Sequence, residues 1–242
     1  VPRNFMINTK RKNYSKGIRC KYTLKYATFN DLDKMHQYLV KYLKKNNALD
    51  SIESARENII FWMQFGCIYY VEKNNEVTNM FALTIKHLSK YEDYRGIVNQ
   101  PYMYIFPYYQ TDISERILVD MIHEIHKLIM AENNLSLVPI NIILLEEEKA
   151  ASLLSLVLKT NPTPDNVEGL VVFRMLIGDD SAISDYSNIH KEYDELNEVE
   201  RKTYDFFSKF DDITDQMIKY FEKYQDRAHI SWMINSILSP EE

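Results

Sequence analysis

Glycine is scarce in this sequence, which contains only five glycines among 242 residues. Phosphate-binding loops need glycine because their backbone must approach the ligand closely, often at positive φ. Here the glycines lie too far apart to form GxGxxG, GxxxxGK[ST] or GxSxG: they are Gly17, Gly66, Gly96, Gly169 and Gly178. The sequence therefore argues against a Rossmann dinucleotide site, a P-loop and an α/β-hydrolase nucleophile elbow.

Cysteine is also rare, and long apolar runs are missing. Two cysteines, Cys20 and Cys67, are too few for a disulfide scaffold or a cysteine-based zinc finger. The longest apolar runs, such as 140–145, are much shorter than the ~20 residues that cross a bilayer. The basic start of the sequence has no apolar signal-peptide core. These absences predict a cytoplasmic or otherwise intracellular protein with no transmembrane segment.

Charge is unevenly distributed, although the net charge is only −6. Residues 1–30 contain eight basic side chains and no acidic one, whereas sixteen acidic and seven basic side chains follow from Asp179 onward. This asymmetry predicts a basic N-terminal arm (1–19), an α/β body (20–178) and an acidic helical extension (179–242). The two charged ends either neutralise each other or bind different partners.

The basic arm has aromatic side chains between its basic ones. Lysine and arginine can neutralise phosphates, while aromatic rings can stack on bases. The arm therefore predicts contact with a nucleic acid or another polyanion through Lys10, Arg11, Lys12, Lys16 and Arg19. An acidic protein neighbour, an anionic membrane surface and a solvated arm without a specific partner are the alternatives.

Hydrophobic periodicity predicts an α+β body. Helical spacing of apolar residues indicates helices over 30–42, 50–65, 112–129 and 147–159. Shorter apolar segments indicate strands over 67–71, 77–86, 102–106, 140–145 and 170–177, with a hairpin turn at 73–76 and the third strand ending at Pro107.

The acidic extension is predicted to be helical over 183–199, 213–224 and 232–238. Its helices carry aromatic side chains that must be buried on the body, on a protein partner or on a second copy of the chain. These residues are Tyr186, Tyr193, Phe206, Phe207, Phe210, Phe221 and Trp232. We therefore expect the extension to supply an assembly interface.

Three segments of the body resemble the fold of the Gcn5-related N-acetyltransferases (GNAT). The hairpin over 67–85 looks like the second and third strands of that family, and Tyr104-Ile105-Phe106-Pro107 looks like the fourth strand. Residues 140–175 look like its last two long strands with a helix between them. Over residues 20–177, the resemblance implies a GNAT-like mixed sheet flanked by helices. It also implies the family's reaction, acyl transfer from an acyl-CoA to an amine.

The resemblance places any bound acyl-CoA beside Phe106, Gln110, Thr111, Ile113 and Ser114. In the family, a [QR]xxGx[GA] loop holds the pyrophosphate through backbone N–H groups. Here Ile113 and Glu115 stand at the glycine positions, so a side chain and a carboxylate oppose the phosphates. Leu154 stands where the family has a tyrosine as general acid, and leucine cannot protonate a thiolate. The catalytic residues are therefore unassigned.

One helix segment is also similar to the N-myristoyltransferase branch of the same superfamily. Ser114, Arg116, Ile122, Glu124 and Ile125 match its SKRLAPVLIKEITRR segment. That branch also lacks the glycine pattern, so its mode of holding an acyl-CoA is compatible with the loop found here. No other cofactor is implied.

Two histidines on the same helix, His123 and His126, lack the HExxH spacing of a zinc protease. We expect them to form a solvent-facing polar stripe, and no metal site is predicted. Three functions remain open: a GNAT-fold protein that has lost ordinary acetyl-CoA catalysis and serves as a binding, structural or assembly protein, an acyl-CoA-dependent N-acyltransferase, and a nucleic-acid-binding accessory protein acting through the basic arm.

Overall fold

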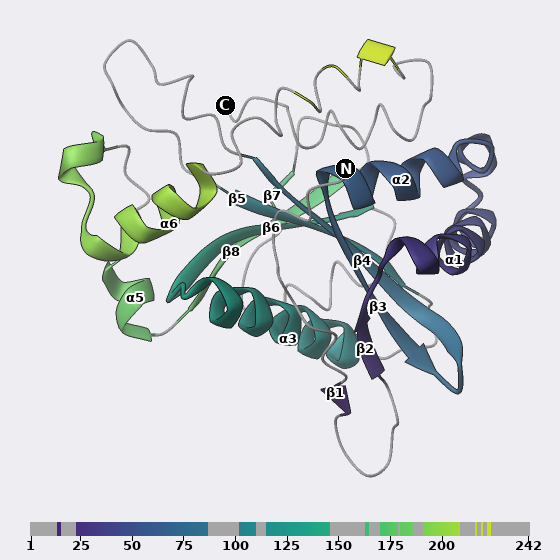
Figure 1. The fold of residues 1–242 in the computed structure, drawn as a ribbon, viewed down its shortest axis with the longest axis horizontal. Coiled ribbons are helices and arrows are strands. Elements are labelled where there is room, and N and C mark those ends of the chain that lie inside the picture. Colours follow the sequence, from purple (N-terminus) through teal and green to yellow (C-terminus); the bar gives the residue numbers. More distant parts are fainter. Residues whose placement is uncertain are drawn as a thin grey trace.

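The computed structural model describes residues 14–15, 23–86, 102–109, 115–145, 163–164, 170–178, 180–185 and 191–208, with a few positions between 216 and 223. In these residues, eight strands form one sheet in the order β1-β2-β3-β4-β5-β6-β8-β7, and helices pack on it (Figure 1). This confirms the predicted α+β class.

The strands are β1 (Tyr14–Ser15), β2 (Thr23–Tyr26), β3 (Gly66–Lys73), β4 (Glu76–Lys86), β5 (Tyr102–Tyr109), β6 (Leu137–Leu145), β7 (Thr163–Pro164) and β8 (Leu170–Gly178). The helices are α1 (Leu32–Lys45), α2 (Ala55–Phe65), α3 (Glu115–Asn133), α5 (Asp180–Asp185) and α6 (Glu198–Ser208). Among the described strands, β5 and β6 are the one parallel pair, and α3 connects them.

Successive side chains of a strand point to opposite faces of the sheet, so β5 contributes to two separate cores. On one face, Met103 and Ile105 pack with Ile125 of α3 and with Phe207 of α6. On the other face, Phe106 and Tyr108 pack with side chains of α1 and α2. The helices therefore hold both sides of β5.

The hairpin between β3 and β4 confirms the turn predicted at 73–76. Asn74 and Asn75 have φ values of 52° and 64°, which asparagine tolerates better than most residues and which suit a tight hairpin turn. At the start of β3, a Cβ on Gly66 would lie 1.8 Å from the carbonyl oxygen of Leu83. Only glycine allows the two strands to approach this closely.

Several predicted boundaries in the body differ from the structure, and two of them have a clear physical reason. The second helix begins at Ala55 rather than at residue 50, because residues Leu49–Ser51 form a separate 3₁₀ turn. The strand predicted to end before Pro107 continues to Tyr109, because β5 remains paired with β4 as far as Asn79 and Tyr109. Strand β2 was not predicted, although Leu24 is buried.

The extension departs from the single helix predicted over 183–199. Helix α5 ends at Asp185, Tyr193–Glu195 forms a 3₁₀ turn, and α6 begins at Glu198. Phe206 and Phe207 are buried in the same core as side chains of α3, and the Thr203 hydroxyl donates to the carbonyl oxygen of Leu137 at 3.2 Å. Helix α6 therefore packs on the body. The helices predicted over 213–224 and 232–238 lie outside the continuously described residues, and the boundary at residue 178 stays a prediction.

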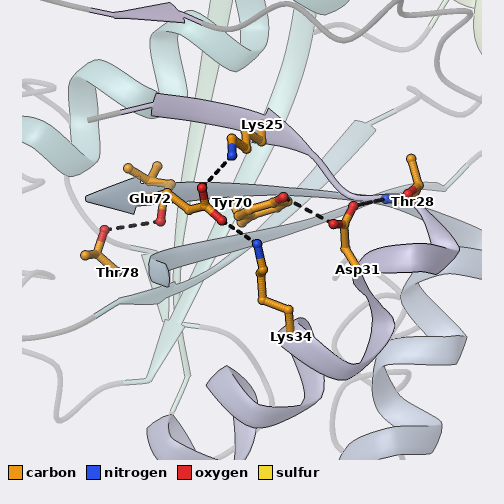
Figure 2. A network of polar contacts seen from close by, with 8 residues as sticks. Lys25, Thr28, Asp31, Lys34, Tyr70, Glu72 and Thr78 are labelled. Atoms are coloured by element: carbon orange, nitrogen blue, oxygen red, sulfur yellow. Dashed lines mark hydrogen bonds and ion pairs between the residues drawn. The ribbon is translucent and has the colours of Figure 1, made fainter. Parts of the chain in front are cut away.

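A polar network centred on Glu72 connects β2, β3 and α1 (Figure 2). The Glu72 carboxylate accepts Lys25 Nζ of β2 at 2.5 Å and Lys34 Nζ of α1 at 2.6 Å. Burial raises the pKa of the Glu72 carboxyl, but hydrogen bonds and charge from the two lysines outweigh burial and lower it below its ordinary value. Asp31, at the start of α1, accepts a hydrogen bond from Tyr70 of β3 at 3.4 Å. The network fixes the first turn of α1 on the sheet.

We expect Gly66→Ala to lower the free energy of unfolding by about 2 kcal/mol or more, because the new methyl group overlaps a backbone carbonyl that has no freedom to move aside. Chemical denaturation measures the change. Wild-type stability in this variant would show that β3 and β4 are not so close at Gly66.

We expect Glu72→Gln to lower stability at neutral pH. The unfolded carboxyl titrates near 4.5 and the folded one lower, so the stabilisation from its charge is fully present above pH 4.5 and is lost as the pH falls through the folded pKa. The variant should therefore lose less stability on acidification than the wild type. Denaturation over a pH series measures this, and Glu76→Gln, at an exposed position of the same hairpin, is the control. Identical pH profiles for Glu72→Gln and wild type contradict the assignment.

Candidate functional site

The parallel contact between β5 and β6 is short. It joins Met103 with Ile140, Tyr104 with Asn141 and Ile105 with Ile142, and then stops. Beyond this point β5 still pairs with β4 as far as Tyr109, and β6 still pairs with β8 as far as Leu145. The two strands therefore continue in separate ladders, and their facing edges are no longer bonded to each other.

Two prolines bracket the parallel contact. Pro139 immediately precedes the first paired residue of β6, and Pro107 stands two residues after the last paired residue of β5. A proline nitrogen has no hydrogen to donate, so a ladder cannot continue through it on its donor side. The positions of the prolines thus account for a contact of only three residue pairs.

Helix α1 holds the end of β5 beside this opening. The Tyr38 hydroxyl lies 2.8 Å from the carbonyl oxygen of Thr78 on β4 and 2.9 Å from that of Tyr108 on β5, and it shares its hydrogen between them. The rings of Tyr42 and Tyr108 meet edge to face, with their centroids 5.1 Å apart. Because the Glu72 network fixes the start of α1, it also sets the position of this contact.

Helix α2 contacts β5 through Trp62. The rings of Trp62 and Phe106 lie 4.8 Å apart between centroids, at the first residue of β5 beyond the parallel contact. Asn58, one helical turn earlier, is fully buried like Trp62. Both polar atoms of the Asn58 amide and the Trp62 indole nitrogen lack a hydrogen-bond partner. Buried polar groups of this kind are uncommon in native proteins.

The start of α3 carries the acidic residue that the sequence placed at a family glycine position. Helix α3 begins at Glu115. The first turn of a helix carries partial positive charge and unpaired N–H groups that suit an anion. In the loop that the resemblance implies, a glycine would stand where α3 begins with Glu115.

His126 contradicts the predicted solvent-facing stripe. His123 is half-buried, but His126 is fully buried and neither ring nitrogen has a partner. Burial, with a smaller effect of His123, lowers the pKa of His126 to about 3. The sequence pattern missed this because histidine at a core position of a helix looks the same as histidine beside the core.

Of the predicted site residues, the structure describes Phe106, which is 2% exposed and lies beside the opening. The remaining acyl-CoA positions lie outside the described residues, as do Leu154 and the basic residues of the arm: they are Gln110, Thr111, Ile113, Ser114, Lys10, Arg11, Lys12, Lys16 and Arg19. Sequence reasoning missed Asn58 and Trp62. Their signal was a polar residue four positions before a tryptophan on an otherwise apolar helix face.

Within the described residues, no three histidine, cysteine, aspartate or glutamate side chains are grouped so as to hold a metal ion. The helices that the structure describes are too short or too polar to cross a membrane.

No family model and no curated protein matches this sequence. Solved structures are similar in fold. The ribosomal-protein-S5-alanine acetyltransferase of Vibrio fischeri is 8% identical, with a TM-score of 0.48, and the match covers 70% of this chain and 98% of that chain. RimL, a ribosomal L7/L12 alpha-N-protein acetyltransferase in complex with coenzyme A, is 11% identical, with a TM-score of 0.45 and coverage of 66% and 96%. A GNAT-family acetyltransferase of Listeria monocytogenes is 10% identical, with a TM-score of 0.41 and coverage of 69% and 100%.

These partial likenesses lie on the side of the fold that the sequence resemblance implied. The described elements of this chain occur in the order that the sequence analysis predicted: two helices, the β3–β4 hairpin, β5, the long helix α3, β6 and β8. What the fold binds must be argued from this chain's own residues.

We expect His126→Leu to reduce the loss of stability on acidification. The unfolded histidine binds a proton near pH 6.5, whereas the folded one resists protonation down to about pH 3. Stability is therefore lost as the pH falls through this window, by up to about 1.4 kcal/mol per pH unit from this one group. Denaturation over a pH series tests this, with His36→Gln on α1 as the control. An unchanged pH slope in His126→Leu contradicts the expectation.

Proposed function

We propose that this protein binds an extended ligand in the opening between β5 and β6 and has lost ordinary acetyl-CoA catalysis. The observation that carries the proposal is the parallel contact of only three residue pairs, beyond which no described residue bonds to the facing backbone edges of β5 and β6, so that these edges could accept a ligand. An elongated molecule with its own donors and acceptors could bond to these edges as an added strand would.

The loss of ordinary acetyl-CoA binding is supported by α3. Glu115 begins this helix, so a carboxylate replaces the glycine at the end of the family's pyrophosphate loop. A carboxylate and a pyrophosphate are both negatively charged at neutral pH, so they repel each other. In addition, Leu154 supplies no proton to a leaving thiolate.

An acyl-CoA-dependent N-acyltransferase is the second candidate. The strand opening favours it, because the resemblance places the acyl-CoA there and the N-myristoyltransferase branch also lacks the glycine pattern. In this candidate, a long acyl chain would compensate for the weak hold on the pyrophosphate through buried apolar area.

The charged ends support separate proposals. The basic arm would bind a nucleic acid or another polyanion, and the 179–242 extension would bind a protein partner or a second copy of the chain. Phe206 and Phe207 are already buried against the body, whereas Tyr193 is 37% exposed. An interface formed by the extension therefore would use the outer side of this region.

Thermal unfolding with acetyl-CoA, CoA and myristoyl-CoA separates the candidates. A ligand at 100 times its Kd stabilises the folded state by about 2.7 kcal/mol, or about 5–10 °C in Tm for a chain of this size. We expect no such shift with sub-millimolar acetyl-CoA. Glu115→Gln should gain affinity for CoA, since it removes the opposing charge, and Glu132→Gln near the other end of α3 is its control.

A large Tm shift with acetyl-CoA would overturn the loss of ordinary binding. A shift with myristoyl-CoA, together with transfer of the acyl group to an amine, would establish the second candidate instead. Fatty-acid-free albumin and a myristate control keep detergent-like effects of the acyl chain out of the comparison.

A further inference from the structure

The solvent-facing side of α1 is basic. Its exposed lysines, which we call the lysine face, are Lys34, Lys41, Lys44 and Lys45. Lys41 lies about two helical turns after Lys34, and the other two follow about one turn later, so the four side chains share one stripe of the helix. Lys34 pairs with Glu72 at 2.6 Å. The other three lysines form no ion pair with a residue that the structure describes. The lysine face therefore carries positive charge that the described part of the chain does not neutralise.

The segment between α5 and α6, together with α6 itself, is acidic. Its exposed carboxylates, which we call the acidic turn, are Glu192, Asp194, Glu195, Glu198 and Asp205. Tyr193 lies among them, and its hydroxyl donates to Asp205 at 2.8 Å. The exposed basic side chains of residues 191–208 are Arg201 and Lys202. Negative charge therefore remains in excess on this surface.

Exposed apolar side chains lie beside both charged surfaces. In the described residues, the exposed large hydrophobic side chains are Phe29 (51% exposed), Leu49 (61% exposed) and Tyr193. Phe29 precedes α1, Leu49 follows it, and Tyr193 belongs to the segment of the acidic turn. Protein interfaces combine apolar and aromatic side chains with a charged rim, whereas a phosphate backbone gains nothing from a leucine. The two surfaces therefore fit a protein partner better than a nucleic acid.

The two charged surfaces lie far apart on one molecule. Helix α1 and helix α6 are at opposite ends of the long axis (Figure 1). The acidic turn of one chain therefore cannot cover its own lysine face, whereas the acidic turn of a second copy can. A contact between two different surfaces of identical chains is heterologous. The net charge of −6 also disfavours a nucleic acid as the partner, because the chain as a whole repels polyanions.

We propose that the lysine face of one chain binds the acidic turn of a second copy, with the exposed apolar side chains beside it adding contact area. This inference rests on the part of the proposed function that gives the 179–242 extension a protein partner or a second copy. Both surfaces are small and charged, so the contact is weak and sensitive to salt.

Sedimentation velocity of the full chain tests the contact. At about 100 µM protein and about 50 mM salt, the wild type should associate beyond the monomer, and about 500 mM salt should dissociate it. Lys41→Glu/Lys44→Glu and, separately, Asp194→Lys/Glu198→Lys should each associate at least about tenfold more weakly, because each places like charges opposite one another.

The chain that carries all four substitutions provides the decisive comparison. Its charges are exchanged between the two surfaces, so it should associate again, which a merely structural effect of the substitutions would not produce. Lys73→Glu/Lys127→Glu is the matched control, because it makes the same change in net charge at exposed positions of β3 and α3. This control should associate like the wild type.

A wild type that stays monomeric under these conditions overturns the inference. Association that either double variant or high salt leaves unchanged also overturns it, as does a four-substitution chain that does not associate. If a single-stranded oligonucleotide binds the wild type but not Lys41→Glu/Lys44→Glu, and the wild type does not self-associate, the lysine face is a polyanion site and the inference is wrong.

The ligand proposal is tested separately. None of these substitutions lies on β5 or β6, so the thermal assay with CoA esters reports on the opening in every variant. Failure of self-association leaves the ligand proposal intact, and a missing ligand shift leaves the contact between copies intact.

Discussion

The architecture depends on one constraint, the point at which β5 and β6 stop pairing. Pro139 and Pro107 limit the parallel ladder to three residue pairs, while antiparallel ladders on the outer sides of both strands continue. Because each strand remains held by its other neighbour, the sheet does not need to close. The opening is therefore a property of the backbone, maintained by packing on both faces and by the Tyr38 hydroxyl at the end of β5.

The sequence predicted the parts of the fold in which hydrophobic periodicity or the residues of a turn give a clear local signal. The apolar spacing of α1 and the turn at Asn74 and Asn75 are examples. The sequence prediction failed where pairing with a neighbouring strand outweighed a local signal. Pro107 was predicted to end its strand, because proline has no N–H to donate. Strand β4 nevertheless pairs with β5 beyond Pro107. Strand β2 is short, so its few buried residues give too little periodicity to detect.

The candidate site was only partly predictable for a related reason. The resemblance pointed to Phe106, which is the first residue of β5 beyond the parallel contact, and its role in binding stays a prediction. Asn58 and His126 were missed because sequence periodicity shows which face of a helix is buried, but not whether a polar residue on that face finds a partner. Such unpaired groups become visible only when every neighbour is placed.

Residue-resolved amide hydrogen exchange tests the central claim most directly. In the free protein, amides of Phe106–Tyr109 and Ile143–Leu145 that do not donate to β4 or β8 should exchange much faster than those of the three parallel pairs, although both sets lie in strands. A bound ligand should protect them. Equal and slow exchange in both sets without ligand would mean that β5 and β6 are paired along their whole length, and the account of an open binding edge would be wrong.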